Sequence, residues 1–135
     1  MNDAEYEALK AKIKGHMDYW TVRLGLRWWR VVSEYVRDSG DMKTDGNRAP
    51  DTAANCAADW RYMHATIKFN MPVYAESDAD EQEYIVVHEL CHVLVNETRD
   101  PEELKGFTPH EERVATTLAK AFIWTRDMTR DEAKL

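Results

Sequence analysis

The spacing of hydrophobic and polar residues predicts a helix near the start of the chain and a strand near its middle. In residues 3–14, apolar side chains recur at helical spacing among strong helix formers, and Gly15 is predicted to end that helix. Residues 65–70 alternate apolar and polar side chains, which predicts a strand with one buried face. Pro72 is predicted to border this strand, because proline cannot extend it.

The segments between these two elements carry weaker signals. Residues 19–36 are rich in Trp, Val, Tyr and Thr, and we interpret them as one or two strands centred on residues 27–36. A helix is the competing interpretation, because the alternation breaks within the run WWRVV. Residues 37–55 have glycines and a proline but almost no large apolar side chains, which predicts a long loop.

A long apolar helix is predicted over EQEYIVVHELCHVLVN, residues 81–96. Its length and its acidic start favour a helix over a strand, although its β-branched content would suit either. Ser77 or Asp78 is placed to cap its first turn. Residues 97–107 are then predicted to turn the chain.

A second long helix is predicted over residues 108–128. Thr108 and Glu111 have the spacing of a capping box, in which each side chain bonds the other residue's backbone amide. Pro109 would occupy the first helical position, where its missing N–H costs nothing. Helices together with a small sheet predict an α+β fold.

Size and composition are those of one small globular domain over residues 1–135, with a hydrophobic fraction of 44%. No apolar run is long enough for a transmembrane helix, and the acidic N-terminus does not have the pattern of a signal peptide. These features predict a cytoplasmic protein. Cys56 and Cys91 are expected to be reduced thiols, with Cys91 buried in its helix.

The formal net charge of −7 argues against a broad electrostatic contact with nucleic acid or with an anionic membrane. Arg23, Arg27 and Arg30 form a local basic cluster, but such clusters usually belong to a solvated face. Neither nucleic acid nor a membrane is therefore expected as a partner.

The run HELCH within the first apolar helix carries the most specific chemistry in the chain. His88 and His92 are four residues apart, so a helix presents both imidazoles on one face. Glu89 lies about 100° around the helix, beside that face. Two imidazoles and a carboxylate suit one zinc ion, and a glutamate beside it can act as the general base. A core helix with two unpartnered histidines would be costly, which further favours a metal.

The third zinc ligand is expected from the second long helix. If the two helices pack antiparallel, the start of the second lies near the HELCH motif. His110, Glu111 and Glu112 are all candidates there, and Glu111 has a structural alternative as the capping-box partner of Thr108. Spacing alone does not choose among the three.

The run VVHELCHVLV, followed about twenty residues later by EERVATTLAKAF, resembles the gluzincin group of zinc metallopeptidases. Its small single-domain versions, the ImmA/IrrE-like and phage-encoded minimal metallopeptidases, are the most similar. The resemblance implies one zinc ion per chain and favours Glu112 as the third ligand, with Ala115 and Thr116 following in the family's pattern. It covers residues 60–125, although the family often has Asp or Asn at the position of Thr116.

The resemblance also implies a minimal zincin-like fold, with a small, mostly antiparallel sheet against the motif helix. Its edge strand would lie along the active-site cleft, and residues 65–70 are the candidate for it. An edge strand can hold an extended peptide by main-chain hydrogen bonds. The transition-state oxyanion usually needs a further donor. The candidates for that donor are Tyr62, His64, Tyr74 and His110.

Three functional hypotheses follow. The first is a zinc endopeptidase with Glu89 as general base, acting on one flexible protein target such as a repressor or phage protein, as the resemblance implies. The second is a non-catalytic zinc-binding module that keeps the fold for regulation or protein binding. The third is a core helix without metal. The motif favours the first, but a fold alone does not fix a function.

Overall fold

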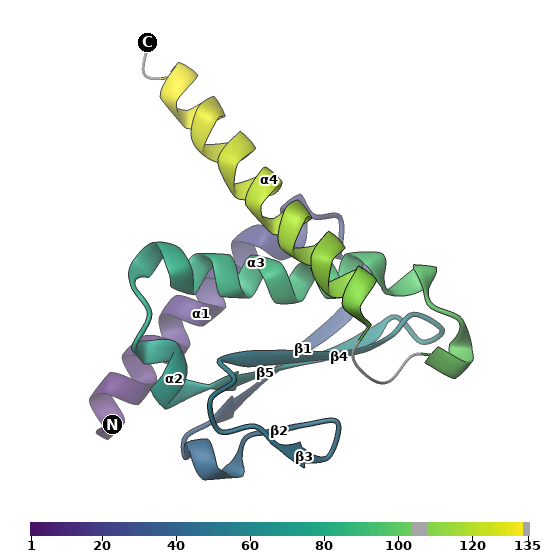
Figure 1. Ribbon diagram of the computed structural model, residues 1–135. Coiled ribbons are helices and arrows are strands. Elements are labelled where there is room, and N and C mark those ends of the chain that lie inside the picture. The colour runs from purple at the N-terminus through teal and green to yellow at the C-terminus, as the bar shows by residue number, and fades with distance from the viewer. Residues whose placement is uncertain (104–107, 134–135) are drawn as a thin grey trace.

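The computed structural model describes residues 1–103 and 108–133. Its four helices and its strands form an α+β fold in which the helices cover one face of a three-stranded sheet (Figure 1). Its elements are α1 (Asp3–Arg23), β1 (Arg30–Val36), η1 (Ser39–Asp41), β2 (Lys43–Thr44), β3 (Asn47–Arg48), β4 (Ala54–Asp59), β5 (His64–Asn70), α2 (Met71–Ala75), α3 (Ala79–Val95), η2 (Asn96–Thr98), η3 (Pro101–Glu103) and α4 (Pro109–Ala133). The predicted fold class is confirmed.

The three-stranded sheet has the order β1-β5-β4. β5 pairs in parallel with β1 and antiparallel with β4, while β2 and β3 form a separate antiparallel hairpin. The strand predicted over residues 65–70 is therefore central, which corrects its expected place at the edge. Its alternation is confirmed, because Ala65, Ile67 and Phe69 are fully buried.

α1 is much longer than predicted, and Gly15 lies inside it instead of ending it. A glycine inside a helix costs about 1 kcal/mol relative to alanine. Met17 and Trp20 continue the buried face of α1 beyond it, and their burial outweighs that cost. The helix ends before Gly25, whose positive φ of 72° suits a residue without a Cβ atom. Of the segment predicted to be extended, residues 30–36 form a strand and residues 19–23 are helical.

The predicted loop over residues 37–55 contains structure that the hydrophobic pattern did not reveal. The β2–β3 hairpin turns at Asp45 and Gly46, which both have positive φ, as a two-residue type I′ turn requires. Met42, the one large apolar residue in this segment, is completely buried. β4 begins at Ala54, inside the predicted loop, and forms an edge of the sheet.

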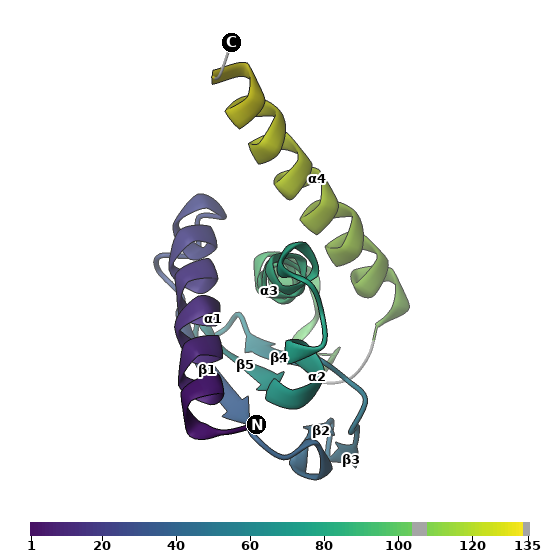
Figure 2. The ribbon, with the colours of Figure 1, turned by 90° about the vertical axis from the view of Figure 1, so that its left-hand side faces the viewer.

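The core lies between the sheet and the two helices α1 and α3. Figure 2 shows α1 and α4 on either side of α3, with the sheet below. α4 runs antiparallel to α3, because its first turn faces His92 whereas Arg126 contacts Glu83 near the start of α3. The helix predicted over residues 108–128 is confirmed and continues to Ala133. Of the predicted turn, residues 104–107 lie outside the described residues.

Two further expectations can be compared with the structure. Cys56 and Cys91 are both free thiols, as expected. Within the described ranges, no helix is both long and apolar enough to span a membrane.

Candidate metal centre

α3 holds the HELCH motif between a capped first turn and a buried apolar face. The Asp78 side chain accepts a hydrogen bond of 2.8 Å from the Glu81 amide, so Asp78 is the cap and Ser77 is not. The buried face of the helix consists of Val86, Val87, Leu90, Cys91 and Val93. This anchored face fixes the rotation of α3 and thereby directs both motif histidines toward α4.

The two histidines meet one carboxylate of α4. Nε2 of His88 lies 2.9 Å from one oxygen of Glu112, and Nε2 of His92 lies 2.9 Å from the other. The two imidazole rings are 4.9 Å apart and nearly perpendicular. Among the described residues, His88, His92 and Glu112 form the group of three side chains whose donor atoms could share a metal ion, all within 4.8 Å of one another.

This donor set fits zinc. Zinc prefers imidazole nitrogen and carboxylate oxygen at about 2.0–2.2 Å in a tetrahedral arrangement, which separates neighbouring donor atoms by about 3.3 Å. Each histidine Nε2 lies 2.9 Å from an oxygen of Glu112, and the donor atoms of the three residues all lie within 4.8 Å of one another, so the group is close to the size that one zinc ion would need. Three protein ligands would also leave the fourth position open, as catalytic zinc sites do.

Glu111 supports His92 from the other side of its ring. Nδ1 of His92 donates to the Glu111 carboxylate at 2.8 Å, and Arg99 Nε donates to the other oxygen of that carboxylate. Burial lowers the pKa of His92, but the Glu111 hydrogen bond and the nearby charges of Glu89 and Glu112 outweigh it, so the pKa is raised. Burial likewise raises the pKa of Glu111, but His92 and Arg99 together lower it below its usual value.

The three consecutive candidates for the third zinc ligand therefore occupy different places in the structure. Glu112 faces both motif histidines, Glu111 contacts His92 and Arg99, and His110 lines a separate hollow on the outer side of α4. Successive helical residues point about 100° apart, so Glu111 and Glu112 reach different nitrogens of the His92 ring, whereas His110 points toward the outer side of α4. Pro109 is the first residue of α4, as predicted.

His88 has different neighbours from those of His92. The hydroxyl oxygen of Thr116 lies 3.3 Å from His88 Nε2, and the Tyr84 ring stacks on the imidazole at a centroid distance of 5.8 Å. At the position where the family often has Asp or Asn, this chain thus places a hydroxyl near His88, whereas His92 has a carboxylate partner in Glu111. Tyr84 and Arg99 were not predicted from the sequence. Neither belongs to a motif, and only their partly buried positions beside the histidines and Glu111 distinguish them.

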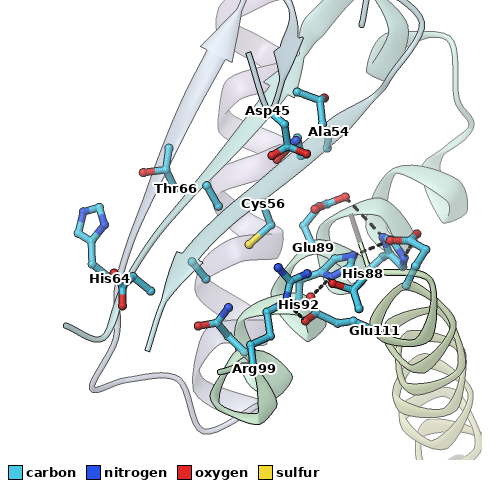
Figure 3. Close-up of a pocket in the computed structure, with 18 of the residues that line it drawn as sticks. Asp45, Ala54, Cys56, His64, Thr66, His88, Glu89, His92, Arg99 and Glu111 are labelled. Carbon is cyan, nitrogen blue, oxygen red and sulfur yellow. Dashed lines mark hydrogen bonds and ion pairs between the residues drawn. The ribbon is translucent and has the colours of Figure 1, made fainter. Parts of the chain in front are cut away.

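Glu89 faces a pocket of about 720 Å³ between α3 and β4 (Figure 3). Its side chain is only 7% exposed, and its carboxylate lies 3.5 Å from Nδ1 of His88. The pocket also contains the inward side chains of β4, including Cys56, and the Asp45 turn of the β2–β3 hairpin. Glu89 therefore lies beside the three-residue group, with open space in front of it.

The four candidates for an oxyanion donor are widely separated. His64 lines the pocket, but Figure 3 shows it at the far end from His88. Tyr74 is fully buried, and its hydroxyl donates to the Gln82 carbonyl at 2.8 Å, which places it in the core. Tyr62 is largely exposed, and His110 lies on the outer side of α4. The structure therefore brings none of the four beside the motif histidines.

An α+β fold, an HExxH helix and a facing glutamate together define the zincin-like class of metal-dependent domains. The chain belongs to the SprT-like family, whose family model matches residues 30–122. This family is related to the zinc metallopeptidases. The zincin-like class inferred from the sequence is thus confirmed, while the finer ImmA/IrrE-like and phage-encoded assignments stay predictions. No curated protein and no solved structure matches the chain.

Proposed function

We propose that this protein is a zinc-dependent peptidase, with His88, His92 and Glu112 as zinc ligands and Glu89 as the general base. The observation that carries this proposal is the position of Glu112, whose two oxygens each lie 2.9 Å from a different motif histidine. Two elements distant in sequence thus converge on one set of donors, and the nearly buried Glu89 stands beside it.

Zinc held by these residues would supply Lewis-acid polarisation of a carbonyl group and activation of water. Glu89 would act first as a general base, accepting the proton from the attacking water. It would then act as a general acid and deliver that proton to the leaving amine. Its low exposure keeps bulk water away from this proton transfer. Glu111 and Arg99 would hold His92 with Nε2 toward the ligand group.

The substrate we propose is an extended segment of a peptide or protein. β4 forms one edge of the sheet and lines the pocket along most of its length. An unpaired strand edge can bind an extended chain by main-chain hydrogen bonds, with little dependence on side chains. A flexible stretch of a target protein would fit such a groove better than a folded surface would.

The decisive experiment compares wild type with Glu89→Gln for zinc content and for hydrolysis of a protein substrate such as casein. We expect one zinc per chain in both proteins and a fall in the rate by about 10²–10⁴-fold in the variant. Glu81→Gln, on an exposed position of the same helix, is the matched control and should keep full activity. Unchanged hydrolysis in Glu89→Gln would contradict the proposal.

Zinc content of ligand variants tests the metal site separately. We expect His88→Ala and Glu112→Ala to lose stoichiometric zinc and Glu111→Ala to retain it at lower affinity. Loss of zinc in Glu111→Ala with retention in Glu112→Ala would reverse the ligand assignment. Zinc binding without cleavage of any peptide in a library would instead favour the alternative of a non-catalytic zinc-binding module.

A further inference from the structure

The outer face of α4 carries apolar side chains that nothing in the described structure covers. The helix packs on α3 through Ala115 and Ala119 and contacts Glu83 of α3 through Arg126, and only its C-terminal end projects past the rest of the described protein (Figures 1 and 2). We define the outer stripe of α4 as Val114, Thr117, Ala121, Trp124 and Met128, all of which are exposed. The largest of these side chains, Trp124, is 70% exposed.

The outer stripe has the spacing of a helix-pairing seam. Val114, Ala121 and Met128 are seven residues apart, and Thr117 and Trp124 fall between them at the second apolar position of a heptad. A repeat of this kind keeps one face of a helix directed at a partner helix over several turns. The opposite face of α4 is the one that packs on α3, so the seam faces away from the metal centre.

A hollow lies at the N-terminal end of this seam. It is lined by His110, Arg113, Val114, Thr117 and Leu118. The first four of these residues have the spacing i, i+3, i+4, i+7, which is the arrangement that forms a hole for one side chain of a facing helix. The large exposed side chain on the same face, Trp124, lies near the other end of the seam.

We propose that α4 pairs antiparallel with α4 of a second copy of this chain, with Trp124 of each copy in the hollow of the other. The helix has a hole near one end and a projecting side chain near the other. In a two-fold antiparallel pair, the projecting side chain of each copy therefore fills the hole of the other. In a parallel pair the two Trp124 side chains would meet, and both hollows would stay empty. The small residues Thr117 and Ala121 would face each other near the crossing and allow close approach.

The outer charges beside the seam favour the same arrangement, whereas Lys120, exposed on the same edge midway between them, would lie near Lys120 of the other copy. Arg113 and Asp127 lie along one edge of the outer stripe, fourteen residues apart. Antiparallel pairing brings Asp127 of one copy level with the first turns of the other, within reach of its Arg113. Both side chains are exposed and of opposite sign, so each pair would be attractive across the edge of the interface.

The contact would extend over about five helical turns, which is a small interface. Interfaces that bury less than about 1,200 Å² belong mostly to weak complexes, so we expect association to depend on protein concentration. Two buried tryptophans would supply a large part of its apolar area, at roughly 150–250 Å² each. The hollow and the tryptophan lie on the same helix, so the stripe is complementary to itself. This self-complementarity favours a second copy of the chain over another protein as the partner.

Sedimentation velocity of the full-length chain tests the proposal. Wild type should show a concentration-dependent monomer–dimer equilibrium, as small interfaces do, and Trp124→Ala should weaken the dimer by about tenfold or more. Trp28→Ala is the matched control, since Trp28 is 87% exposed but lies outside α4, and it should associate like wild type. A monomeric wild type at the highest concentration, or equal association of Trp124→Ala and wild type, would overturn the proposal.

Cross-linking tests the antiparallel direction. His110→Cys and Met128→Cys, mixed and oxidised, should form a disulfide between the two variants, because these positions would lie opposite each other. His110→Cys alone should not cross-link, since its two copies would be about 27 Å apart along the helices. Cross-linking of each variant with itself but not with the other would show parallel pairing and exclude the proposed one. Wild type, with Cys56 and Cys91 only, measures the background.

Discussion

The Glu111 carboxylate lies 2.8 Å from Nδ1 of His92, on the side of the imidazole opposite to the nitrogen that faces Glu112. A carboxylate in this position holds the proton on Nδ1 and leaves the Nε2 lone pair free to bind a metal. Arg99 donates to the other oxygen of the same carboxylate, which offsets the carboxylate's charge and fixes its orientation. The pair therefore sets both the tautomer and the direction of one proposed zinc ligand.

Substituting Glu111 with Gln should weaken zinc binding by about 10–100-fold without abolishing it, as is typical when the partner of a histidine ligand is lost. The amide can no longer offer a charged acceptor to Nδ1–H. Competition with a fluorescent zinc chelator measures the change. Glu132→Gln, at an exposed position of the same helix, is the control. Zinc affinity equal to wild type in Glu111→Gln would show that His92 needs no such support.

A second ionic contact joins the other ends of α3 and α4. Arg126 donates to both oxygens of Glu83, at 2.6 and 2.9 Å, and Trp20 from α1 donates to the same carboxylate at 3.0 Å. These hydrogen bonds outweigh the effect of partial burial and lower the pKa of Glu83 to about 2. The carboxylate thus links three helices in its charged form.

A depressed pKa in the folded state makes stability depend on acidity. The contribution of Glu83 is present above about pH 4.5, the ordinary pKa of a glutamate, and is lost as the pH falls toward 2. Glu83→Gln should lower the unfolding free energy at pH 7 by roughly 2 kcal/mol, the scale of a hydrogen bond to a charged group. Urea unfolding at several pH values measures both effects. The difference between wild type and variant should shrink below pH 4, and a constant difference would contradict the assignment.

Asn70, the last residue of β5, connects this strand by hydrogen bonds to the segments that precede β4. Its side chain is fully buried, donates to the Pro50 carbonyl and accepts from the Ser39 hydroxyl, each at 2.9 Å. Asn70→Ala would leave both groups without this partner, and we expect a loss of about 2–3 kcal/mol in unfolding free energy. Chemical denaturation measures it, with Asn47→Ala on exposed β3 as the control. Equal stability of the two variants would show that water replaces the lost contacts.

The cysteines should be unreactive in the folded protein. Burial raises the pKa of Cys91 to about 12. Burial and the charges of Glu89 and Glu111 also raise the pKa of the Cys56 thiol well above its usual range. The reactive thiolate is therefore scarce at neutral pH. Iodoacetamide at pH 8, followed by mass spectrometry, should label neither cysteine until urea unfolds the chain. Rapid labelling of the native protein would contradict this expectation.

The elements predicted well from sequence are those whose pattern is local. α3 and α4 have long periodic runs with clear starts, and β5 alternates over its whole length. The error at Gly15 arose because local propensity was outweighed by burial of Met17 and Trp20, side chains whose partners lie far away in sequence. The dipeptide Asp45-Gly46 did carry a hairpin signal, but strands of two residues are too short to show alternation.

β4 could not be recognised because its side chains are small. Its sequence ANCAAD has no large apolar residue and has low strand propensity. In the folded chain, the small side chains of β4 on the pocket side leave the space in front of Glu89. The small size of these residues therefore explains both the weak strand pattern in the sequence and the open pocket. The order of the strands depends on pairings between distant segments, and the sequence pattern does not specify them.

The motif histidines and Glu89 could be proposed from five residues, because their geometry is that of a single helix turn. The choice between Glu111 and Glu112 is different, since the two residues are chemically identical neighbours. Only the rotation of α4 relative to α3 separates them, and that rotation is set by Ala115 and Ala119 in the core. The family resemblance favoured Glu112, and the structure places Glu112 opposite both histidines.

The contact between Arg126 and Glu83 also affects the proposed metal centre, which it does not touch. Arg126 lies fourteen residues beyond Glu112, about 21 Å along α4. A helix is stiff over this length, so fastening one end restricts sliding and rotation at the other. We therefore expect the Arg126 contact to help hold the Glu112 carboxylate opposite its two histidines. Sequence changes at that contact would tune the site from a distance, through the helix itself.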